Sequence, residues 1–398
     1  MNLKVLHIGK FYPPHAGGME THVQALATRQ KKFLDAEVIV ANDSLRTCHA
    51  VVDRVPVTRV ASLGVVASMP LCPTLAAHLR SRRPDVVHLH LPNPGAAAAY
   101  LMSRHKGRLV VTHHSDILGR KHLRKLCDGM VRRVMEQASV IIVTSLRYAQ
   151  TSIELAPFLE KCRVVPLGLD PGPRERRQPA RSRQIRDRFG GSLVVAIGRL
   201  VPYKGFEYLI RAMALVAGNL VIVGSGPLRG RLENLVTQLQ VADRVHLLGN
   251  VDDLQPFYEA ADIVVVPSIT RAEAFGMVQL EAMARGRPVI NTNLDSGVPE
   301  VSLHGKTGLT VPPADESALA EAIDRLLGDA AARQRFGTAA RLRVLKEFDI
   351  DTMVRRTVDL YQGIETSVQQ PAGEGALRRA EPDRDMSSGS IPAIREVM

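Results

Sequence analysis

The chain has 398 residues, a length typical of two or three domains rather than one. Its hydrophobic content of 45% and charged content of 23% are those of a folded protein. No apolar run reaches the roughly 18 residues that a membrane-spanning helix needs, so no such helix is expected. The four cysteines form no CxxC pair, which argues against a zinc site or a disulfide framework and fits a reducing cytoplasm.

The net charge of +12 lies in residues 1–168, which hold 23 Lys and Arg against 11 Asp and Glu, whereas the remainder is balanced. Such a half is expected to face nucleic acid or an acidic lipid surface, although an arginine-rich composition without a partner is the simpler alternative. Residues 119–133 predict a basic amphipathic helix that lies on an anionic membrane, and its apolar residues are Leu123, Leu126, Met130 and Val131. Its basic residues are Arg120, Lys121, Arg124, Lys125, Arg132 and Arg133.

Short apolar runs alternate with helical stretches along the first half, which is the pattern of βαβ units. The strands are expected at residues 3–8, 37–40, 55–60, 85–89, 109–112, 140–144 and 163–165. Helices are expected between them at residues 20–32, 74–83, 122–136 and 146–158. Several strands are almost continuous Val, Ile and Leu, which indicates a parallel sheet covered by helices on both faces.

The pattern restarts after a Pro- and Gly-rich linker at residues 166–173 and a charged stretch at 174–188. Strands are expected at residues 193–197, 220–223, 245–247, 263–266, 288–291 and 308–311, followed by two helices within 314–348 and one at 351–364. The fold class is therefore α/β, with two Rossmann-like doubly wound domains facing across a cleft. We expect domains at 1–168 and 169–350, a helix at 351–366 that returns to the first domain, and a disordered tail at 367–398.

The most informative segment is residues 273–281, which follows the expected strand 263–266 and opens a helix near Gly276. Glu273 precedes this helix and Glu281 lies on its second turn, so two carboxylates bracket a helix N-terminus. Unpaired backbone N–H groups there suit a diphosphate, and the two carboxylates can hold hydroxyl groups on either side of it. The simpler alternative is an amphipathic helix with a capping glutamate.

Pro267-Ser268, the two glutamates and the continuation at residues 282–290 resemble the signature of family 4 retaining glycosyltransferases of the GT-B fold, and the similarity extends over most of residues 1–365. The resemblance implies that Glu273 contacts hydroxyl groups of the donor sugar and that Glu281 holds the ribose diol. Donor contacts are expected also from the start of the helix, at Phe275, Gly276 and Met277.

Residues 198–205 place a glycine turn with Arg199 and Lys204 between a strand and a helix, a suitable clamp for a pyrophosphate leaving group. The loop resembles the phosphate-binding loop of the family. Gly224 and Gly226 end another strand, where a turn near the nucleotide and a purely structural turn remain equally open, since the rest of the dinucleotide fingerprint is missing. Gly249 and Asn250 are similar to the family segment that contacts the base.

Two features of the first half are expected to face the donor. Gly17 and Gly18 precede a helix and can let a phosphate or the acceptor approach the backbone, although a plain tight turn is the alternative. His113 and His114 end the strand 109–112, at the sheet edge where ligands collect. The resemblance assigns His114 to the cleft histidine that contacts the transferring sugar, with His113 as the alternative one position away.

No metal and no cofactor are expected. Asp349 and Asp351 spell a DxD pair but precede a helix, where aspartate is a good N-cap. The family reaction retains the anomeric configuration and needs no second carboxylate, because the departing phosphate can take the proton of the acceptor from the same face. Arg199, Lys204 and the helix N-terminus are expected to stabilise the leaving charge.

The segments at residues 9–20, 91–94 and 114–116 look like those of bacterial mannosyl- and rhamnosyl-type transferases of surface-polysaccharide assembly. This favours GDP-mannose as the nucleoside-diphosphate sugar, with a UDP-hexose as the alternative, and a glycan or polyprenyl-linked acceptor at the inner face of the membrane. The expected location is cytoplasmic and peripheral to that membrane.

Three rival functions are open at the level of sequence. A nucleotide-sugar epimerase or hydrolase can share the fold, and it would release sugar without an acceptor. A dinucleotide oxidoreductase needs the missing fingerprint and its ribose acid. A basic nucleic-acid-binding protein would use the first half, but aromatic residues make up only 4% of the chain and no recognised binding module is present, so no nucleic-acid partner is expected.

Overall fold

The computed structural model describes residues 3–15, 17–66, 69–116, 121–170 and 178–363, with only the backbone described at 121–127. Residues 1–366 form one compact unit. The tail expected to be disordered, residues 367–398, lies outside the described residues, as do residues 119 and 120 of the basic stretch.

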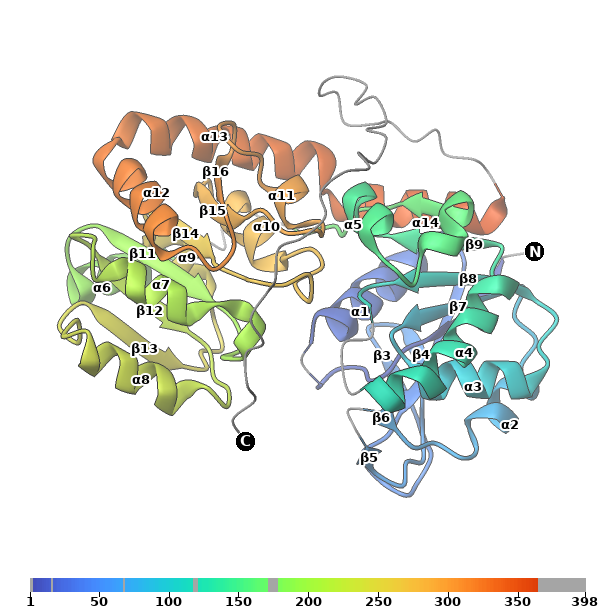
Figure 1. Cartoon of the computed structure of the whole chain (residues 1–398). Coiled ribbons are helices and arrows are strands. Elements are labelled where there is room, and N and C mark those ends of the chain that lie inside the picture. The colour runs from blue at the N-terminus through green and yellow to red at the C-terminus, as the bar shows by residue number, and fades with distance from the viewer. Residues whose placement is uncertain (1–2, 16, 67–68, 117–120, 171–177, 364–398) are drawn as a thin grey trace, which may run out of the picture. The chain divides into compact units, whose positions relative to one another are not determined.

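The first half forms an eight-stranded sheet with the strand order β10-β9-β8-β7-β1-β2-β4-β3 (Figure 1). The strands are β1 Lys4–Ile8, β2 Asp35–Ala41, β3 Cys48–Val52, β4 Val55–Val60, β7 Val86–Leu91, β8 Arg108–His113, β9 Val140–Val143 and β10 Cys162–Val164. Every pair is parallel except the β3–β4 hairpin at one edge. A separate small hairpin joins β5 Val65–Val66 to β6 Met69–Pro70.

The sequence prediction missed the edge strand β3, because its side chains are mostly exposed and its apolar run, Ala50-Val51-Val52, is short. It pairs with β4 through a tight turn at Asp53 and Arg54, both of which have positive φ angles of 50° and 67°. Positive φ at both turn positions is the geometry of a type I′ hairpin, here built without glycine.

The first sheet is covered by helices α1 Gly18–Gln30, α2 Leu75–Arg80, α3 Pro94–Ser103, α4 Lys121–Gln137 and α5 Leu146–Thr151, and by the 3-10 helix Ala156–Lys161. Helix α3 was not expected, yet Asn93 caps it by accepting a hydrogen bond from the Ala96 N–H at 3.2 Å. The single helix predicted at 146–158 is wrong. It ends at Thr151, where the backbone of Ser152 turns extended, and the chain resumes as the 3-10 helix Ala156–Lys161, which has Pro157 in its first turn.

The second half forms a six-stranded parallel sheet with the order β13-β12-β11-β14-β15-β16. The strands are β11 Leu193–Ile197, β12 Asn219–Val223, β13 Val245–Gly249, β14 Ile263–Val266, β15 Val289–Thr292 and β16 Gly308–Val311. The helices are α6 Pro179–Phe189, α7 Phe206–Met213, α8 Arg229–Gln238, α9 Gln255–Ala260, α10 Met277–Ala284, α11 Val298–Val301, α12 Glu316–Gly328 and α13 Ala330–Glu347, with a 3-10 helix at Pro202–Lys204. The predicted strands of this half are all present, because strands buried on both faces have unbroken apolar sequences.

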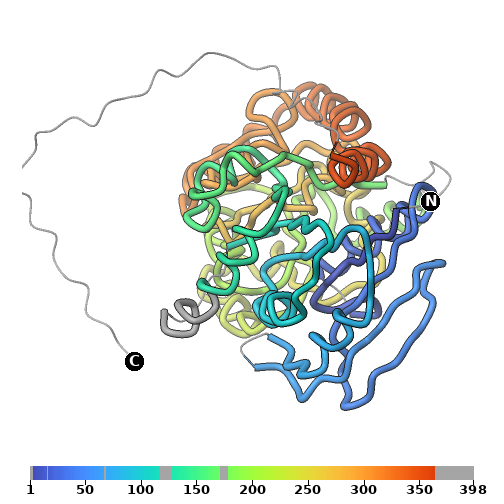
Figure 2. The backbone as a smooth tube through the Cα atoms, turned by 90° about the vertical axis from the view of Figure 1, so that its right-hand side faces the viewer, coloured from blue at the N-terminus to red at the C-terminus, as the bar shows by residue number. Residues whose placement is uncertain are grey.

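The last helix, α14 Ile350–Gln362, packs on the first sheet rather than the second. In Figure 2 the last two helices, α13 and α14, are the orange to red coils of the tube. Met353, Val354 and Val358 share a core cluster with Val5 and Val110 of the first sheet. Asp349 caps the helix by accepting a hydrogen bond from the Thr352 N–H at 2.8 Å, so its carboxylate acts as the expected N-cap.

Candidate active site

A buried ion pair joins the two loops that follow β11 and β14. Glu273 is only 8% exposed, and its Oε2 lies 2.5 Å from Lys204 Nζ. Ser268, at the end of β14, donates its hydroxyl to the same carboxylate at 3.0 Å. Burial alone would lower the pKa of Lys204, but the Glu273 carboxylate overrides it and raises that pKa. The Lys204 ammonium group therefore keeps its charge, and the pair lies at the carboxyl ends of the adjacent parallel strands β11 and β14.

Two further cations lie near this pair. Arg199 is close enough to Lys204 to repel it electrostatically, and it acts in the same way on Lys10, which follows β1 in the first half. Burial lowers the pKa of Lys10, the attraction of Glu20 opposes that shift, and the repulsion by Arg199 adds to it. The sequence analysis did not name Lys10, although its position just after the first strand could have marked it as a candidate ligand-binding residue. Three cations in one place favour a polyanionic ligand.

Helix α10 begins where the sequence predicts, after Gly276. The φ angle of Gly276 is 81°, a left-handed conformation that favours glycine. Phe275 is buried in the core of the second sheet, where its ring meets Phe348, so it can face a ligand only through its backbone. Met277 packs against the same core. The start of α10 thus offers backbone N–H groups rather than side chains.

Glu281 lies on the second turn of α10 and lines a pocket of about 230 Å³. It accepts a hydrogen bond from the hydroxyl of Tyr258 on α9. Burial raises the pKa of Glu281, while the Tyr258 hydrogen bond and the charge of Arg285 oppose that shift. Asp170, Asp252 and Gln255 line the same pocket. Tyr258 is a residue that the sequence analysis missed, because nothing local links it to the helix that carries Glu281.

The glycines after β12 and β13 have a packing role. A Cβ atom at Gly224 would lie 2.0 Å from the carbonyl oxygen of Gly198, and one at Gly226 would lie 2.5 Å from that of Leu200. These glycines therefore let the loop after β12 touch the loop that carries Arg199. Gly249 has a φ angle of 80° and ends β13, and exposed Asn250 follows it.

The loop after β1 holds Gly17 immediately before α1. Its backbone is extended, and a Cβ atom there would lie 2.2 Å from a carboxylate oxygen of Glu20. Gly18 has open space around its Cβ position. Residue 16 lies outside the described part of the chain.

The two histidines after β8 have different surroundings. His113 is fully buried, with Nε2 at 3.1 Å from Glu154 Oε2 and Nδ1 at 3.0 Å from the hydroxyl of Tyr148. Both of its ring nitrogens are therefore used inside the first half. His114 is half-buried, and its Nε2 lies 3.1 Å from His90 Nδ1. Of these two histidines, only His114 has a ring nitrogen that makes no hydrogen bond to a described residue.

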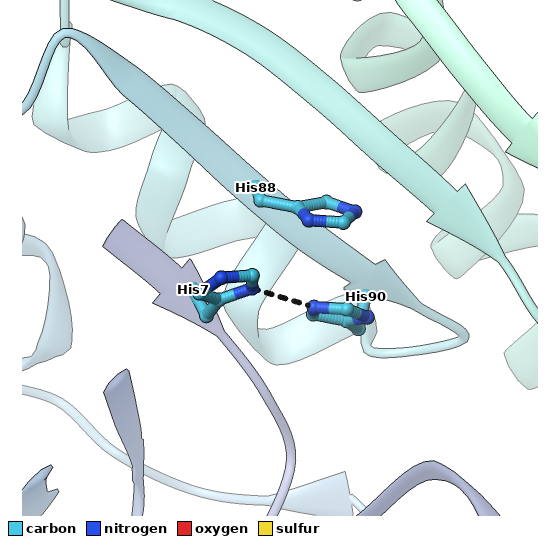
Figure 3. A group of neighbouring side chains, drawn as sticks. All are labelled: His7, His88 and His90. Atoms are coloured by element: carbon cyan, nitrogen blue, oxygen red, sulfur yellow. Dashed lines mark hydrogen bonds between the residues drawn. The ribbon is translucent and has the colours of Figure 1, made fainter. Parts of the chain in front are cut away.

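Behind His114 lies a buried histidine network that the sequence analysis missed. His7 on β1 faces His88 in the strand register, and His90 lies on the same face of β7 two residues further on (Figure 3). The alternation of His88 and His90 along one strand was a usable signal. The hydrogen-bonded chain runs in the order His114, His90, His7, Gln30, Tyr361, His88 and Thr112.

Burial keeps these histidines neutral. It lowers the pKa of His7 to about 4 and holds the pKa values of His88, His90 and His114 well below their usual range. Mutual repulsion among the rings adds to this effect for the last three.

The tautomers follow from the orientation of the Gln30 amide, whose N–H group donates to the Tyr361 hydroxyl. Its carbonyl oxygen therefore accepts from His7 Nε2, at 2.7 Å. His7 Nδ1 then accepts from His90 Nε2 at 3.2 Å, and His90 Nδ1 accepts from His114 Nε2. The network assigns the proton of His114 to Nε2 and leaves Nδ1 as an acceptor.

The loop that carries His114 is tied to the loop after β14. Arg271 places Nε 2.9 Å from Asp116 Oδ2, and both side chains are largely buried. The hydroxyl of Ser152 also donates to Asp116. A second link runs from Arg147, whose backbone N–H donates to Glu300 at 2.9 Å. These contacts connect the first sheet's loops to the half that holds Glu273.

The predicted membrane-binding surface is only partly described. The side chains of residues 121–127 and the whole of 117–120 lie outside the described residues. Val131 is 3% exposed and packs in the core of the first sheet, so its placement on a membrane-facing side is wrong. No described helix is long and apolar enough to cross a bilayer.

Comparison with known proteins identifies the family. Residues 16–172 match the family model described as Glycosyltransferase Family 4, and residues 180–343 match Glycosyl transferases group 1. The O-antigen chain mannosyltransferase C of Escherichia coli is 28% identical over 364 residues, which cover 90% of this chain and 98% of that protein. The D-rhamnosyltransferase WbpZ of Pseudomonas aeruginosa is 32% identical over 266 residues, covering 66% of this chain and 70% of that one.

A third relative is the GDP-mannose-dependent alpha-(1-6)-phosphatidylinositol monomannoside mannosyltransferase of Mycobacterium tuberculosis, 29% identical over 385 residues and covering 90% of this chain and 98% of that protein. Among solved structures, sucrose-phosphate synthase from Thermosynechococcus elongatus superposes with a TM-score of 0.76 at 24% identity, covering 91% of this chain and 99% of the other. These findings confirm the expected α/β class with two Rossmann-like domains. The chain therefore belongs to the family 4 and group 1 glycosyltransferases, and it is a hexosyltransferase with the GT-B fold.

Proposed function

We propose that the chain transfers a manno-configured hexose from a nucleoside-diphosphate sugar, GDP-mannose in the first instance, to a glycan or lipid-linked glycan in cell-surface polysaccharide synthesis. The observation that carries the proposal is the buried Lys204–Glu273 ion pair with Arg199 and Lys10 beside it. A diphosphate needs concentrated positive charge, and the carboxylate beside it can accept hydrogen bonds from sugar hydroxyls.

The proposed roles follow the geometry. Lys204 and Arg199 neutralise the charge that grows on the departing diphosphate, with Lys10 as a third cation and the backbone at Gly276 as an N–H donor. Glu273 holds hydroxyl groups of the sugar. Glu281, whose pKa is raised by burial, accepts hydrogen bonds from the ribose hydroxyl groups in the pocket that it lines with Tyr258. Backbone around Gly249 and Asn250 meets the base.

His114 is the proposed contact to the transferring sugar from the first half. His113 is the weaker candidate, because Glu154 and Tyr148 occupy both of its ring nitrogens. The unprotonated Nδ1 assigned to His114 suits a hydrogen bond from a sugar hydroxyl. Gly17 and Gly18 let the donor or the acceptor approach the backbone at the start of α1.

We propose that transfer retains the anomeric configuration. The bond from the anomeric carbon to the phosphate oxygen breaks, the acceptor oxygen bonds to the same face of that carbon, and the departing phosphate takes the acceptor proton. The Glu273 carboxylate forms an ion pair with Lys204 and accepts a hydrogen bond from Ser268. These contacts support a role in holding sugar hydroxyl groups rather than in nucleophilic attack. The proposed reaction uses no metal and no cofactor.

Relatives support the choice of donor and acceptor. Mannose and D-rhamnose share the axial hydroxyl at C2, and the three relatives are named for transfer of one or the other. One of them is named as GDP-mannose-dependent and acts on a phosphatidylinositol mannoside. A lipid-linked acceptor would place the protein at the inner, anionic face of the membrane, in line with the basic first half. A UDP-hexose is the alternative donor.

A donor panel tests the proposal. Purified protein is supplied with GDP-mannose or UDP-hexoses, with and without a polyprenyl-diphosphate-linked sugar, and released nucleoside diphosphate is measured. We expect acceptor-dependent release from GDP-mannose, loss of release in Lys204→Met, and normal release in Lys346→Met, which changes an exposed lysine on α13. The anomeric signal of the product reports retention or inversion.

The same experiment separates the rival functions. Equal consumption of donor with and without acceptor would identify a nucleotide-sugar hydrolase, and a new sugar nucleotide would identify an epimerase. An inverted product would refute the retaining mechanism but not the transfer. No release from any donor, by protein that still binds nucleoside diphosphate, would refute the proposed donor class.

A further inference from the structure

Three histidines at the carboxyl edge of the first sheet meet in one place. A ring nitrogen of each of His22, His90 and His114 lies within 4.8 Å of the other two. The rings of His22 and His114 are 5.0 Å apart between centroids, and those of His22 and His90 are 5.8 Å apart. His22 makes no hydrogen bond to any described residue, so binding of a metal would break no such bond of His22.

The spacing of this His22–His90–His114 cluster fits a tetrahedral metal. Zinc binds imidazole nitrogen at about 2.0–2.1 Å, so two ligands of one tetrahedral ion stand about 3.3 Å apart. His90 Nδ1 and His114 Nε2 are 3.1 Å apart, which is nearly this separation. A ring nitrogen of the half-buried His22 lies within 4.8 Å of both, so this third ligand has to move closer when a metal binds, and the fourth position is left open.

The protonation pattern needs one change to accept a metal. His90 Nδ1 already carries a lone pair, because His90 donates its other N–H to His7. His114 has only to move its proton from Nε2 to Nδ1, so no proton has to be lost from the site.

The residues behind the cluster form an outer shell. His90 donates to His7, and His7 donates to the Gln30 carbonyl oxygen, which fixes the ring of His90 with its lone pair outward. Histidines that bind metals almost always donate their second N–H in this way, and such partners strengthen binding. The relay that sets the tautomer of His114 therefore also prepares His90 as a ligand.

Two neighbouring groups in the described part of the chain have suitable spacing but are already engaged. In the group of His7, His88 and His90, both nitrogens of His88 are held by Tyr361 and Thr112, and all three rings are buried (Figure 3). In the group of His113, Asp116 and Glu154, the Asp116 carboxylate is paired with Arg271.

We propose that His22, His90 and His114 form a binding site for a transition-metal cation of the zinc type, and that the bound cation inhibits transfer by protonating His114 Nδ1. The inhibitory part rests on the proposed function of His114, whereas the binding part does not. The cation is not a cofactor of the reaction, because binding at His114 Nε2 moves the proton to Nδ1, the nitrogen proposed to accept a hydrogen bond from the sugar.

Direct binding tests the site without any sugar nucleotide. Full-length protein without a polyhistidine tag is titrated with Zn²⁺ against a chromophoric chelator, and Co²⁺ serves as a spectroscopic probe of tetrahedral coordination. We expect one Zn²⁺ per chain and tetrahedral Co²⁺ bands. Both should disappear in His22→Ala and in His22→Gln, which keeps the size of the side chain, and both should persist in His49→Ala, an exposed histidine on β3.

Residues behind the cluster should change zinc affinity without abolishing binding. Gln30→Leu removes the acceptor that orients His7, and we expect zinc affinity to fall by about 10–100-fold. Wild-type zinc affinity in folded His22→Gln, or octahedral Co²⁺ in the wild type, would overturn the proposed site. A zinc site that leaves transfer unaffected at full occupancy would overturn only the inhibitory part, since binding and transfer are measured in separate experiments.

Discussion

The change Glu273→Gln tests whether the buried Lys204–Glu273 ion pair stabilises the second domain. The side chains of Lys204 and Glu273 are only 14% and 10% exposed, so the change leaves an ammonium group buried without its counter-ion. Removing one partner of a buried pair costs about 3–5 kcal/mol of folding free energy. For a domain of this size, 1 kcal/mol lowers the unfolding temperature by about 2–4 °C, so we expect a loss of at least about 6 °C.

A double-mutant cycle separates this cost from side-chain packing. Lys204→Met alone should also destabilise the domain, because it leaves the carboxylate buried, although Ser268 still donates to it. The double variant Glu273→Gln/Lys204→Met removes both charges, so its unfolding temperature should exceed that expected from adding the two single effects.

The dependence on pH provides an internal check. In the wild type the folded-state pKa of Lys204 is raised, so the stability from the pair is present below the unfolded pKa of lysine and is lost as pH rises through the folded value. Glu273→Gln removes the carboxylate that raises that pKa, whereas burial, the largest influence, still lowers it, and the repulsion by Arg199 adds to the lowering. The buried lysine then loses its proton more easily, so the gap in stability between wild type and variant should narrow in alkaline buffer.

Differential scanning calorimetry on the four proteins, with isothermal titration of the nucleoside diphosphate beside it, measures these effects. We expect Glu273→Gln to retain diphosphate binding and to lose turnover, since the carboxylate acts on the sugar rather than on the phosphates. Equal unfolding temperatures in wild type and Glu273→Gln, together with strictly additive single effects, would refute the buried ion pair.

Three further predictions concern the rest of the site. Glu281→Ala should raise KM for the donor with a smaller effect on kcat, because the ribose does not change during the reaction; unchanged steady-state kinetics would remove Glu281 from the site. His114→Ala should lower transfer by orders of magnitude while calorimetric binding of the diphosphate persists, whereas His113→Ala should chiefly lower the unfolding temperature; the reverse pattern would exchange their roles. The protein should bind anionic but not neutral vesicles through its first half, co-sediment with them, and dissociate in high salt; equal binding to both kinds of vesicle would contradict a Coulombic interaction. The variant for that test replaces four basic residues by Ser: Arg120, Lys121, Arg124 and Lys125.

The elements of the fold were largely predictable because their signals are local. The strands at 193–197 and 263–266 are continuous apolar runs, and parallel strands covered on both faces require such runs. The start of α10 at Gly276 was also predictable, because a glycine with positive φ marks the turn. The exposed edge strand β3 was missed because its apolar run is short, and the break at Ser152 was missed because no glycine or proline marks it in the sequence.

The sequence by itself determined the α/β class, the two repeats of strands and helices, and the residues that carry the family signature. Only the tertiary structure brought Lys10 beside Arg199, Tyr258 onto Glu281, and His7, His88 and His90 behind His114. These partners are separated by tens to hundreds of residues, and no local periodicity records a pairing made by the packing of distant strands. The tautomer of His114 is the clearest case, because it depends on a hydrogen-bonded chain that passes through Gln30 on α1 and ends at Tyr361 on the last helix.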